Sequence, residues 1–128
     1  MDNTIHFDTP NLAKAVEALT DDELDRLSFG AVEIDPQGVV RKYNRTEYQD
    51  SGLGSRSPLG KHFFADVAPC MDNGYFRGRI DKALREGKLD ISFSFVGDFS
   101  DRDRELKARV QSSRNGGMWV FIHRPATE

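Results

Sequence analysis

The segment that constrains the fold most is a continuous apolar run near the carboxyl end, Met118-Trp119-Val120-Phe121-Ile122. A short apolar run of this kind, bounded by a turn signal, favours a strand that is buried on both faces. The turn signal is Asn115-Gly116-Gly117, directly before the run. We therefore expect residues 118–122 to form a central strand of a sheet.

Four other segments carry strand patterns. The clearest is Leu89–Val96, in which apolar and polar residues alternate, as expected for a strand with one buried face. Asp35-Pro36-Gln37-Gly38 has the Pro and Gly placement of a tight turn and predicts a hairpin between the strands on either side of it. The four predicted strands are residues 31–34, 39–43, 89–96 and 106–110.

Two short helices are expected before the first strand. Thr9-Pro10 predicts a helix start, with Leu12, Val16 and Leu19 at helical spacing on one face. The stretch from Thr20 to Glu23 has the pattern of a capping box, and it predicts a second helix whose apolar side includes Leu24 and Leu27. Helices this short are not stable alone, so we expect them to dock on the core.

Two helical segments are expected between the second and third strands. Asn44 is a candidate cap for a short helical turn that contains Glu47. The segment Tyr75–Glu86 has an apolar face, a favourable Asp81–Arg85 pair and a following Gly87, and it predicts the longest helix. Five antiparallel strands with helices on one face give an α+β domain. We expect one domain, 1–128, with a helical N-terminal cap (1–28) and a core (29–124).

Composition excludes several classes of protein. The net charge is -3, from 18 basic and 21 acidic residues, and no basic stripe interleaves with aromatic residues, so a nucleic-acid partner is not expected. No apolar run is long enough to span a membrane, and the first residues lack the basic and apolar regions of a signal peptide, so we expect a cytoplasmic protein. His6, His62 and His123 lack metal-ligand spacing, and we expect no metal site.

Cys70 is the only cysteine of the 128 residues, so it cannot form an internal disulfide. From its own segment it could be a packed thiol, a nucleophile, a metal ligand or an attachment point. A free cysteine is most often a small buried apolar residue. No spacing of His or Asp suggests a base for Cys70, which argues against a thiol enzyme.

Four segments together resemble the PAS domains, and most closely the photoactive yellow protein family, over roughly residues 19–124. The most specific segment ends in Val67-Ala68-Pro69-Cys70, which PAS domains in general do not share. The segments are Leu27-Ser28-Phe29-Gly30-Ala31, Tyr43-Asn44-Arg45-Thr46-Glu47, Gly60-Lys61-His62-Phe63-Phe64-Ala65-Asp66-Val67-Ala68-Pro69-Cys70 and Trp119-Val120-Phe121.

The resemblance implies a blue-light photoreceptor, not an enzyme, with a PAS-like five-stranded sheet. It implies that Cys70 carries trans-4-coumaric acid (4-hydroxycinnamic acid) as a thioester. The phenolate would accept hydrogen bonds from Tyr43 and Glu47, and Ser51 would bond to the tyrosine. These residue types suit a buried anion, because a Tyr hydroxyl and a protonated carboxyl donate without adding charge. Burial and a nearby phenolate would each raise the pKa of Glu47 and keep it protonated.

The resemblance also predicts the pocket wall and two departures from the family. Leu53 stands where the family usually has an Arg over the chromophore, so we expect a shifted absorption maximum or chromophore pKa. The loop containing Phe99 lacks the Met that speeds thermal return, so we expect slow dark recovery. The predicted wall residues are Val32, Leu53, Phe63, Val67, Ala68, Pro69 and Phe99.

An alternative is a PAS-type small-molecule or protein interaction module that carries no chromophore and in which Cys70 is only packed. In either case the sequence contains no effector domain, so a signal would pass to an unidentified downstream protein or through self-association. We expect a monomer or a weak dimer.

Overall fold

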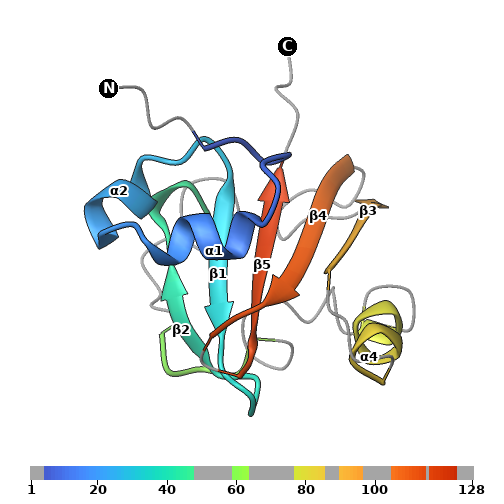
Figure 1. Cartoon of the computed structure of the whole chain (residues 1–128). Coiled ribbons are helices and arrows are strands. Elements are labelled where there is room, and N and C mark those ends of the chain that lie inside the picture. The colour runs from blue at the N-terminus through green and yellow to red at the C-terminus, as the bar shows by residue number, and fades with distance from the viewer. Residues whose placement is uncertain are drawn as a thin grey trace.

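The computed structural model describes residues 5–47, 59–63, 77–85, 90–96, 105–114 and 116–123. These residues form one five-stranded antiparallel sheet with the strand order β2-β1-β5-β4-β3 (Figure 1). The strands are β1 (Gly30–Ile34), β2 (Val40–Tyr43), β3 (Asp90–Val96), β4 (Glu105–Ser112) and β5 (Met118–His123). The helices with described bounds are α1 (Leu12–Glu17), α2 (Asp21–Asp25) and α4 (Arg77–Arg85).

The central position of β5 confirms the prediction from its apolar run. β5 pairs with β1 on one side and with β4 on the other, and residues 119–122 are all buried. All five residues of β1 are buried as well. A strand loses its apolar–polar alternation when both faces of the sheet are covered, which is the case here for β1 and β5.

The hairpin between β1 and β2 is also confirmed. The amide of Gly38 donates to the carbonyl of Asp35 (2.9 Å), and Gly38 has a φ of 87°, which favours glycine. The Asp35 carboxylate accepts from the amides of Gln37 and Val39 (2.9 and 3.0 Å) and pairs with Arg41 (2.7 Å). The turn is therefore held by one nearly buried carboxylate.

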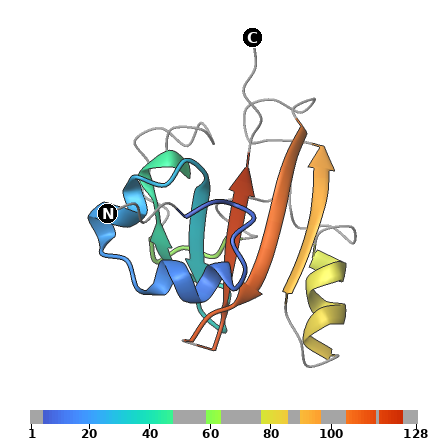
Figure 2. The ribbon, with the colours of Figure 1, turned by 45° about the horizontal axis from the view of Figure 1, so that its top comes forward.

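Helices α1 and α2 lie on one face of the sheet, which we call the cap face (Figures 1 and 2). Phe29 joins this layer to β5, because its ring meets Phe7 at 5.9 Å and Phe121 at 6.0 Å, both edge to face. The Trp119 ring stacks on Phe121 at 5.7 Å. The buried apolar cluster between cap and sheet comprises Leu12, Ala13, Val16, Leu24, Leu27, Phe29, Ala31, Trp119 and Phe121.

Polar contacts also tie the N-terminal residues to the sheet. Arg109 donates from Nη1 to the carbonyls of Phe7 and Thr9 (2.7 and 2.8 Å). The amide of Ala13 donates to Gln111 Oε1 (2.7 Å). Both sheet residues lie on β4, on the cap face, so this strand holds the N-terminal segment and the first turn of α1.

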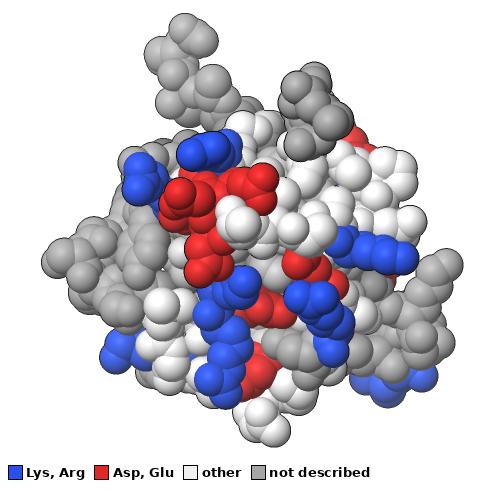
Figure 3. All heavy atoms as spheres, turned by 60° about the vertical axis from the view of Figure 1, so that its left-hand side comes forward, with Lys and Arg blue, Asp and Glu red and all other residues white. Residues whose placement is uncertain are grey.

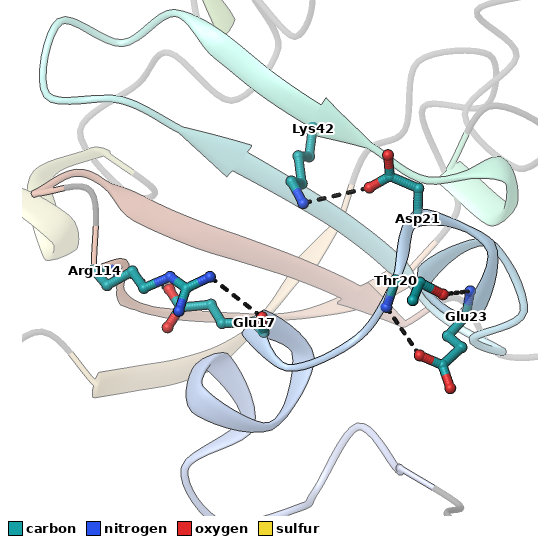
Figure 4. Close-up of polar contacts among 6 residues, drawn as sticks. All are labelled: Glu17, Thr20, Asp21, Glu23, Lys42 and Arg114. Carbon is teal, nitrogen blue, oxygen red and sulfur yellow. Dashed lines mark hydrogen bonds and ion pairs between the residues drawn. The ribbon is translucent and has the colours of Figure 1, made fainter.

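Glu17 makes a further link between α1 and the sheet. Its carboxylate accepts from the indole N–H of Trp119 and from the amide of Arg114, both at 2.9 Å. Its carbonyl accepts from the Arg114 side chain, as Figure 4 shows. The end of α1 is thereby bonded to β5 and to the turn that precedes it.

The capping box that was predicted for α2 is present. Thr20 Oγ1 accepts from the Glu23 amide (3.2 Å) and Glu23 Oε1 accepts from the Thr20 amide (2.9 Å), as seen in Figure 4. The same view shows Lys42 of β2 paired with Asp21 of α2 (3.3 Å).

The predicted start of the first helix was wrong. The helix begins at Leu12, after Asn11 in a left-handed conformation (φ 53°), and not at Thr9-Pro10. Thr9 Oγ1 instead accepts from the His6 amide (2.9 Å), so its hydroxyl closes a turn before the helix. Asn11 tolerates the left-handed region better than most residues, which allows the chain to turn there.

The sheet face opposite the cap face is apolar and buried, and we call it the site face. Side chains at alternate strand positions share a face, so Gly30, Val32 and Ile34 of β1 belong here. Their register partners on β5 lie on the same face. Each of the following side chains on the site face is at most 1% exposed: Val32, Ile34, Ala108, Val110, Val120 and Ile122.

The charged side chains are mixed in sign. In Figure 3, which shows the side carrying α2, Lys and Arg residues are interspersed with Asp and Glu residues across the described surface.

The described helices include none with the length and apolar character that a membrane span requires.

The Asp35 turn leads to a prediction about acid stability. The Val39 amide lowers the pKa of the Asp35 carboxyl below its usual 3.8; burial opposes this in part, and Arg41 and the Gln37 amide lower the pKa further. Because the folded pKa is depressed, the stability that Asp35 contributes is present above its usual pKa and is lost as the pH falls through the folded value. We expect Asp35→Asn to be less stable than wild type near neutral pH, with the difference shrinking in acid.

The measurement is urea unfolding followed by Trp119 fluorescence between about pH 2.5 and pH 6. Asp22→Asn removes one negative charge from an exposed position of α2 and controls for net charge. A difference between Asp35→Asn and wild type that stays constant over this range would contradict the assignment.

Candidate functional site

The candidate site begins where β2 ends. Tyr43, the last residue of β2, pairs with Val32 of β1 and is 7% exposed. Residues 45–47 are helical, and the Glu47 amide donates to Asn44 Oδ1 (3.1 Å). The predicted cap by Asn44 is therefore confirmed. It turns the chain so that Tyr43 and Glu47 are both buried close to β1.

Asn44 does more than cap this turn, and it is only 1% exposed. Its side-chain oxygen also accepts from the Ala31 amide (3.0 Å), and its side-chain nitrogen donates to the carbonyls of Leu24 (2.9 Å) and Phe29 (3.1 Å). Its backbone amide donates to the Ala31 carbonyl (3.1 Å). Both acceptor positions and both donor hydrogens of the side-chain amide are thus used, which a buried amide requires.

Glu47 is completely buried, at 0% exposure, and its carboxyl lies against Gly30 at the start of β1. Gly30 and Val32 share the site face, so Glu47 and Tyr43 both approach this face at neighbouring positions of one strand. Burial disfavours the charged form of a carboxyl. The arrangement therefore suits a neutral carboxylic acid that donates a hydrogen bond.

The turn that carries Glu47 is also hydrogen-bonded to the N-terminal cap. Three consecutive residues of the turn each reach the segment 24–27, which contains the end of α2. The contacts are Asn44 Nδ2 to the Leu24 carbonyl (2.9 Å), the Arg45 amide to Asp25 Oδ1 (2.8 Å) and Thr46 Oγ1 to the Leu27 carbonyl (2.5 Å).

A surface cleft of about 250 Å³ lies beside Tyr43. Leu24 and Leu59 contribute its other apolar walls, and its rim is charged. The charged residues are Asp21, Asp25, Arg41 and Lys42. Tyr43 is thus reached from the solvent side by a cleft that also touches the cap.

Four of the predicted site residues are described by the structure. Tyr43, Glu47, Val32 and Phe63 are all buried, the last three at 0% exposure. The register of β1 and β2 pairs Val32 with Tyr43, so these two residues lie side by side. The other predicted residues lie outside the described part of the chain: Ser51, Leu53, Val67, Ala68, Pro69, Cys70 and Phe99. Within the described residues, no three His, Cys, Asp or Glu side chains gather as metal ligands do.

Sequence reasoning missed two features of this site. It identified Asn44 as a helix cap, but not as the residue whose side chain bonds to β1 at Ala31 and to the backbone carbonyls of Leu24 and Phe29. It also gave no role to Gly30. The signal available for Gly30 was a glycine at the start of a buried strand, which often marks a close approach by another group.

Comparison with known proteins gives consistent relatives, although no family model matches the chain. The chain is 31% identical to the photoactive yellow protein of Halochromatium salexigens over 123 residues, which cover 95% of this chain and 98% of the relative. It is also 31% identical to the photoactive yellow protein of Rhodothalassium salexigens over 121 residues, with 94% and 97% covered.

Solved structures agree with these relatives. The photoactive yellow protein domain of the sensor histidine kinase Ppr from Rhodospirillum centenum superposes with a TM-score of 0.71 at 33% identity, covering 85% of this chain and 96% of that domain. A PAS domain from Colwellia psychrerythraea has a TM-score of 0.60 at 14% identity, with 81% and 92% covered, and supports the fold alone.

The hydrogen bonds of Asn44 lead to a prediction about stability. Asn44→Ala leaves two buried amides without their acceptor and two buried carbonyls without their donor, so we expect it to lower the free energy of unfolding by about 3 kcal/mol. Urea unfolding followed by Trp119 fluorescence measures this loss.

Two variants control the experiment. Asn44→Asp keeps the acceptors and loses the donors, so its stability should lie between those of Asn44→Ala and wild type. Arg45→Ala changes the next residue, which is exposed, and should stay within about 0.5 kcal/mol of wild type. An Asn44→Ala variant as stable as Arg45→Ala would contradict the role given to Asn44.

Proposed function

The chain belongs to the photoactive yellow protein family, and from this premise we propose that it senses blue light through trans-4-coumaric acid bound as a thioester to Cys70. The family consists of PAS-type photoreceptors and is sensory rather than catalytic. The proposal assigns the phenolate end of the chromophore to the site face, with Tyr43 and Glu47 as hydrogen-bond donors and Ser51 as a partner of Tyr43.

The observation that carries the proposal is the complete burial of Glu47 against Gly30 of β1, together with the burial of Tyr43, which pairs with Val32 of the same strand. An anion in such a place is stable only when donors surround it, and these two side chains donate without adding charge. Val32, which pairs with Tyr43, is completely buried and apolar, and hydrogen bonds are stronger in such low-dielectric surroundings than in water.

The chemistry we propose is a light-driven transfer of one proton. Isomerisation of the chromophore double bond from trans to cis makes its phenolate oxygen the stronger base. The proton then leaves the Glu47 carboxyl oxygen and bonds to the phenolate oxygen, which gives a neutral phenol and a glutamate carboxylate. Net charge is conserved, but the negative charge now sits on a completely buried side chain, which is costly.

The contacts of the turn suggest how this charge changes the protein. Residues 44–46 bond directly to the segment 24–27, so a rearrangement of the Glu47 turn disturbs the support of the N-terminal cap. The cap comprises short helices that depend on docking, and such elements are the first to open. We propose that release of the cap is the signal read by a downstream protein.

Leu53 and Phe99 are proposed to adjust the pocket relative to other family members. Leu53 in place of an Arg would change the absorption maximum or the chromophore pKa, and Phe99 without a neighbouring Met would give slow dark recovery. Both residues lie outside the described part of the chain.

The first prediction from this proposal concerns the chromophore. Wild-type protein treated with an activated derivative of coumaric acid should become yellow, bleach reversibly under blue light and gain the mass of one coumaroyl group. Cys70→Ser should gain neither the colour nor the mass, because it lacks the thiol that forms the thioester. A visible spectrum and an intact-mass measurement decide the result.

Two outcomes count against the proposal. Failure of the wild-type protein to take up the chromophore would favour a PAS-type binding module instead. Equal labelling of wild type and Cys70→Ser would place the attachment elsewhere.

The second prediction concerns release of the cap. Illumination of the holoprotein should speed proteolysis within the cap, where Lys14 is an exposed trypsin site. Glu17→Ala removes the acceptor for the Trp119 indole and the Arg114 amide, so cleavage in the dark should rise by about tenfold. Limited trypsin digestion in light and dark, resolved by mass spectrometry, measures both effects.

The matched control is Asp22→Ala at an exposed position of α2, which should behave as wild type in the dark. If the cap of the wild-type protein is cut at the same rate in light and dark, its release is not the signal.

A further inference from the structure

The backbone of Gly30 lies so close to the Glu47 carboxyl that a side chain at position 30 would collide with it. A Cβ atom at position 30 would lie 1.9 Å from Glu47 Oε1, 3.0 Å from Cδ and 3.2 Å from Cβ. Ordinary contact with a Cβ begins at 3.4 Å, so the missing side chain is what allows the Glu47 carboxyl to occupy its position.

Backbone conformation does not explain this glycine. Among the described residues the glycines with positive φ are Gly38, Gly60 and Gly116, so Gly30 has a conformation that other residues adopt. It lies in β1 opposite Ile122 of β5, in regular antiparallel register. Glycine weakens a strand interior relative to alanine, so its presence here needs a reason other than strand formation.

From this geometry we infer that Gly30 is a positioning residue of the photoreceptor site: its bare backbone forms the notch that holds the Glu47 carboxyl against the site face. The inference rests on the proposed function for its consequence in the photocycle, but the notch itself does not depend on a chromophore. Asn44 fixes the turn of Glu47 through the backbone, and Gly30 fixes the end of the side chain. The donor is then placed before any ligand binds, which lowers the cost of binding an anion there.

The consequence is that one methyl group at position 30 should separate the donor from the phenolate. Hydrogen bonds weaken steeply with distance and angle, so a carboxyl oxygen displaced by more than 1 Å no longer donates well. Excitation moves negative charge away from the phenolate oxygen, so a donor at that oxygen stabilises the ground state more than the excited state. Loss or weakening of the donor therefore shifts the absorption band to longer wavelength, and the amide N–H of a glutamine is a weaker donor than a carboxyl O–H.

The spectral experiment compares four holoproteins prepared with the same activated coumaric acid derivative: wild type, Gly30→Ala, Glu47→Gln and Gly78→Ala. Gly30→Ala should shift to longer wavelength, in the direction of Glu47→Gln. Gly78→Ala is the matched control, because a Cβ at position 78 in α4 meets no atom within 4 Å beyond its chain neighbours and the backbone of its own helix, and its band should equal that of wild type. A Gly30→Ala band identical to that of wild type overturns the inference.

A second experiment uses the full-length chain without chromophore. Gly30→Ala should lower the urea midpoint in the wild-type background and lower it much less in the Glu47→Ala background, where Oε1 and Cδ are absent. Equal loss in both backgrounds means that position 30 does not act through Glu47 and overturns the inference. If wild type takes up no chromophore, the proposed function fails, and this experiment still decides whether Gly30 holds Glu47.

Discussion

One buried side-chain amide, that of Asn44, connects the elements on which the rest of this structure depends. It caps the turn that carries Glu47, pairs with Ala31 at the start of β1, and donates to Leu24 and Phe29 on the way from α2 into β1. An amide buried to 1% exposure is tolerated only when all its donors and acceptors are used, as they are here. Asn44 therefore helps to fix the positions of three elements: the turn that carries Glu47, the strand β1 and the N-terminal cap.

This connection gives a short route between the proposed chemistry and the proposed signal. Glu47 lies on the site face, and the N-terminal cap lies on the opposite face of the sheet. Residues 44–46, directly before Glu47, form hydrogen bonds to the segment 24–27 of the cap. In the proposed mechanism, a negative charge on Glu47 would act on the hydrogen bonds that support α2 through the adjoining residues 44–46, and no long pathway through the core is required. The anchors of α1, such as Glu17 to Trp119, hold the same cap from its other end.

The elements that the sequence predicted correctly are those decided by neighbouring residues. The apolar run of β5, the turn chemistry of residues 35–38 and the capping box at Thr20 each act within a few positions, and each was found where expected. The start of α1 was wrong although its cue was also local. Thr9 and Pro10 favour a helix start, but the Thr9 hydroxyl bonds to the His6 amide and the chain turns at Asn11 instead. The Thr9 hydroxyl can either cap a helix that begins at Pro10 or accept a hydrogen bond from the His6 amide, and helix propensity alone does not predict which of these forms.

For the site, the sequence by itself determined the cap at Asn44 and a family resemblance, and it is this resemblance that implies Tyr43 and Glu47 as donors and Cys70 as the attachment point. The tertiary structure decided that Glu47 is completely buried, that its carboxyl sits in the notch left by Gly30, and that Asn44 and Glu17 bond to distant parts of the chain. The physical reason is the range of the interactions. Periodicity and capping act between residues a few positions apart, whereas burial and the close approach of Glu47 to Gly30 depend on which strands pair and which face each side chain takes.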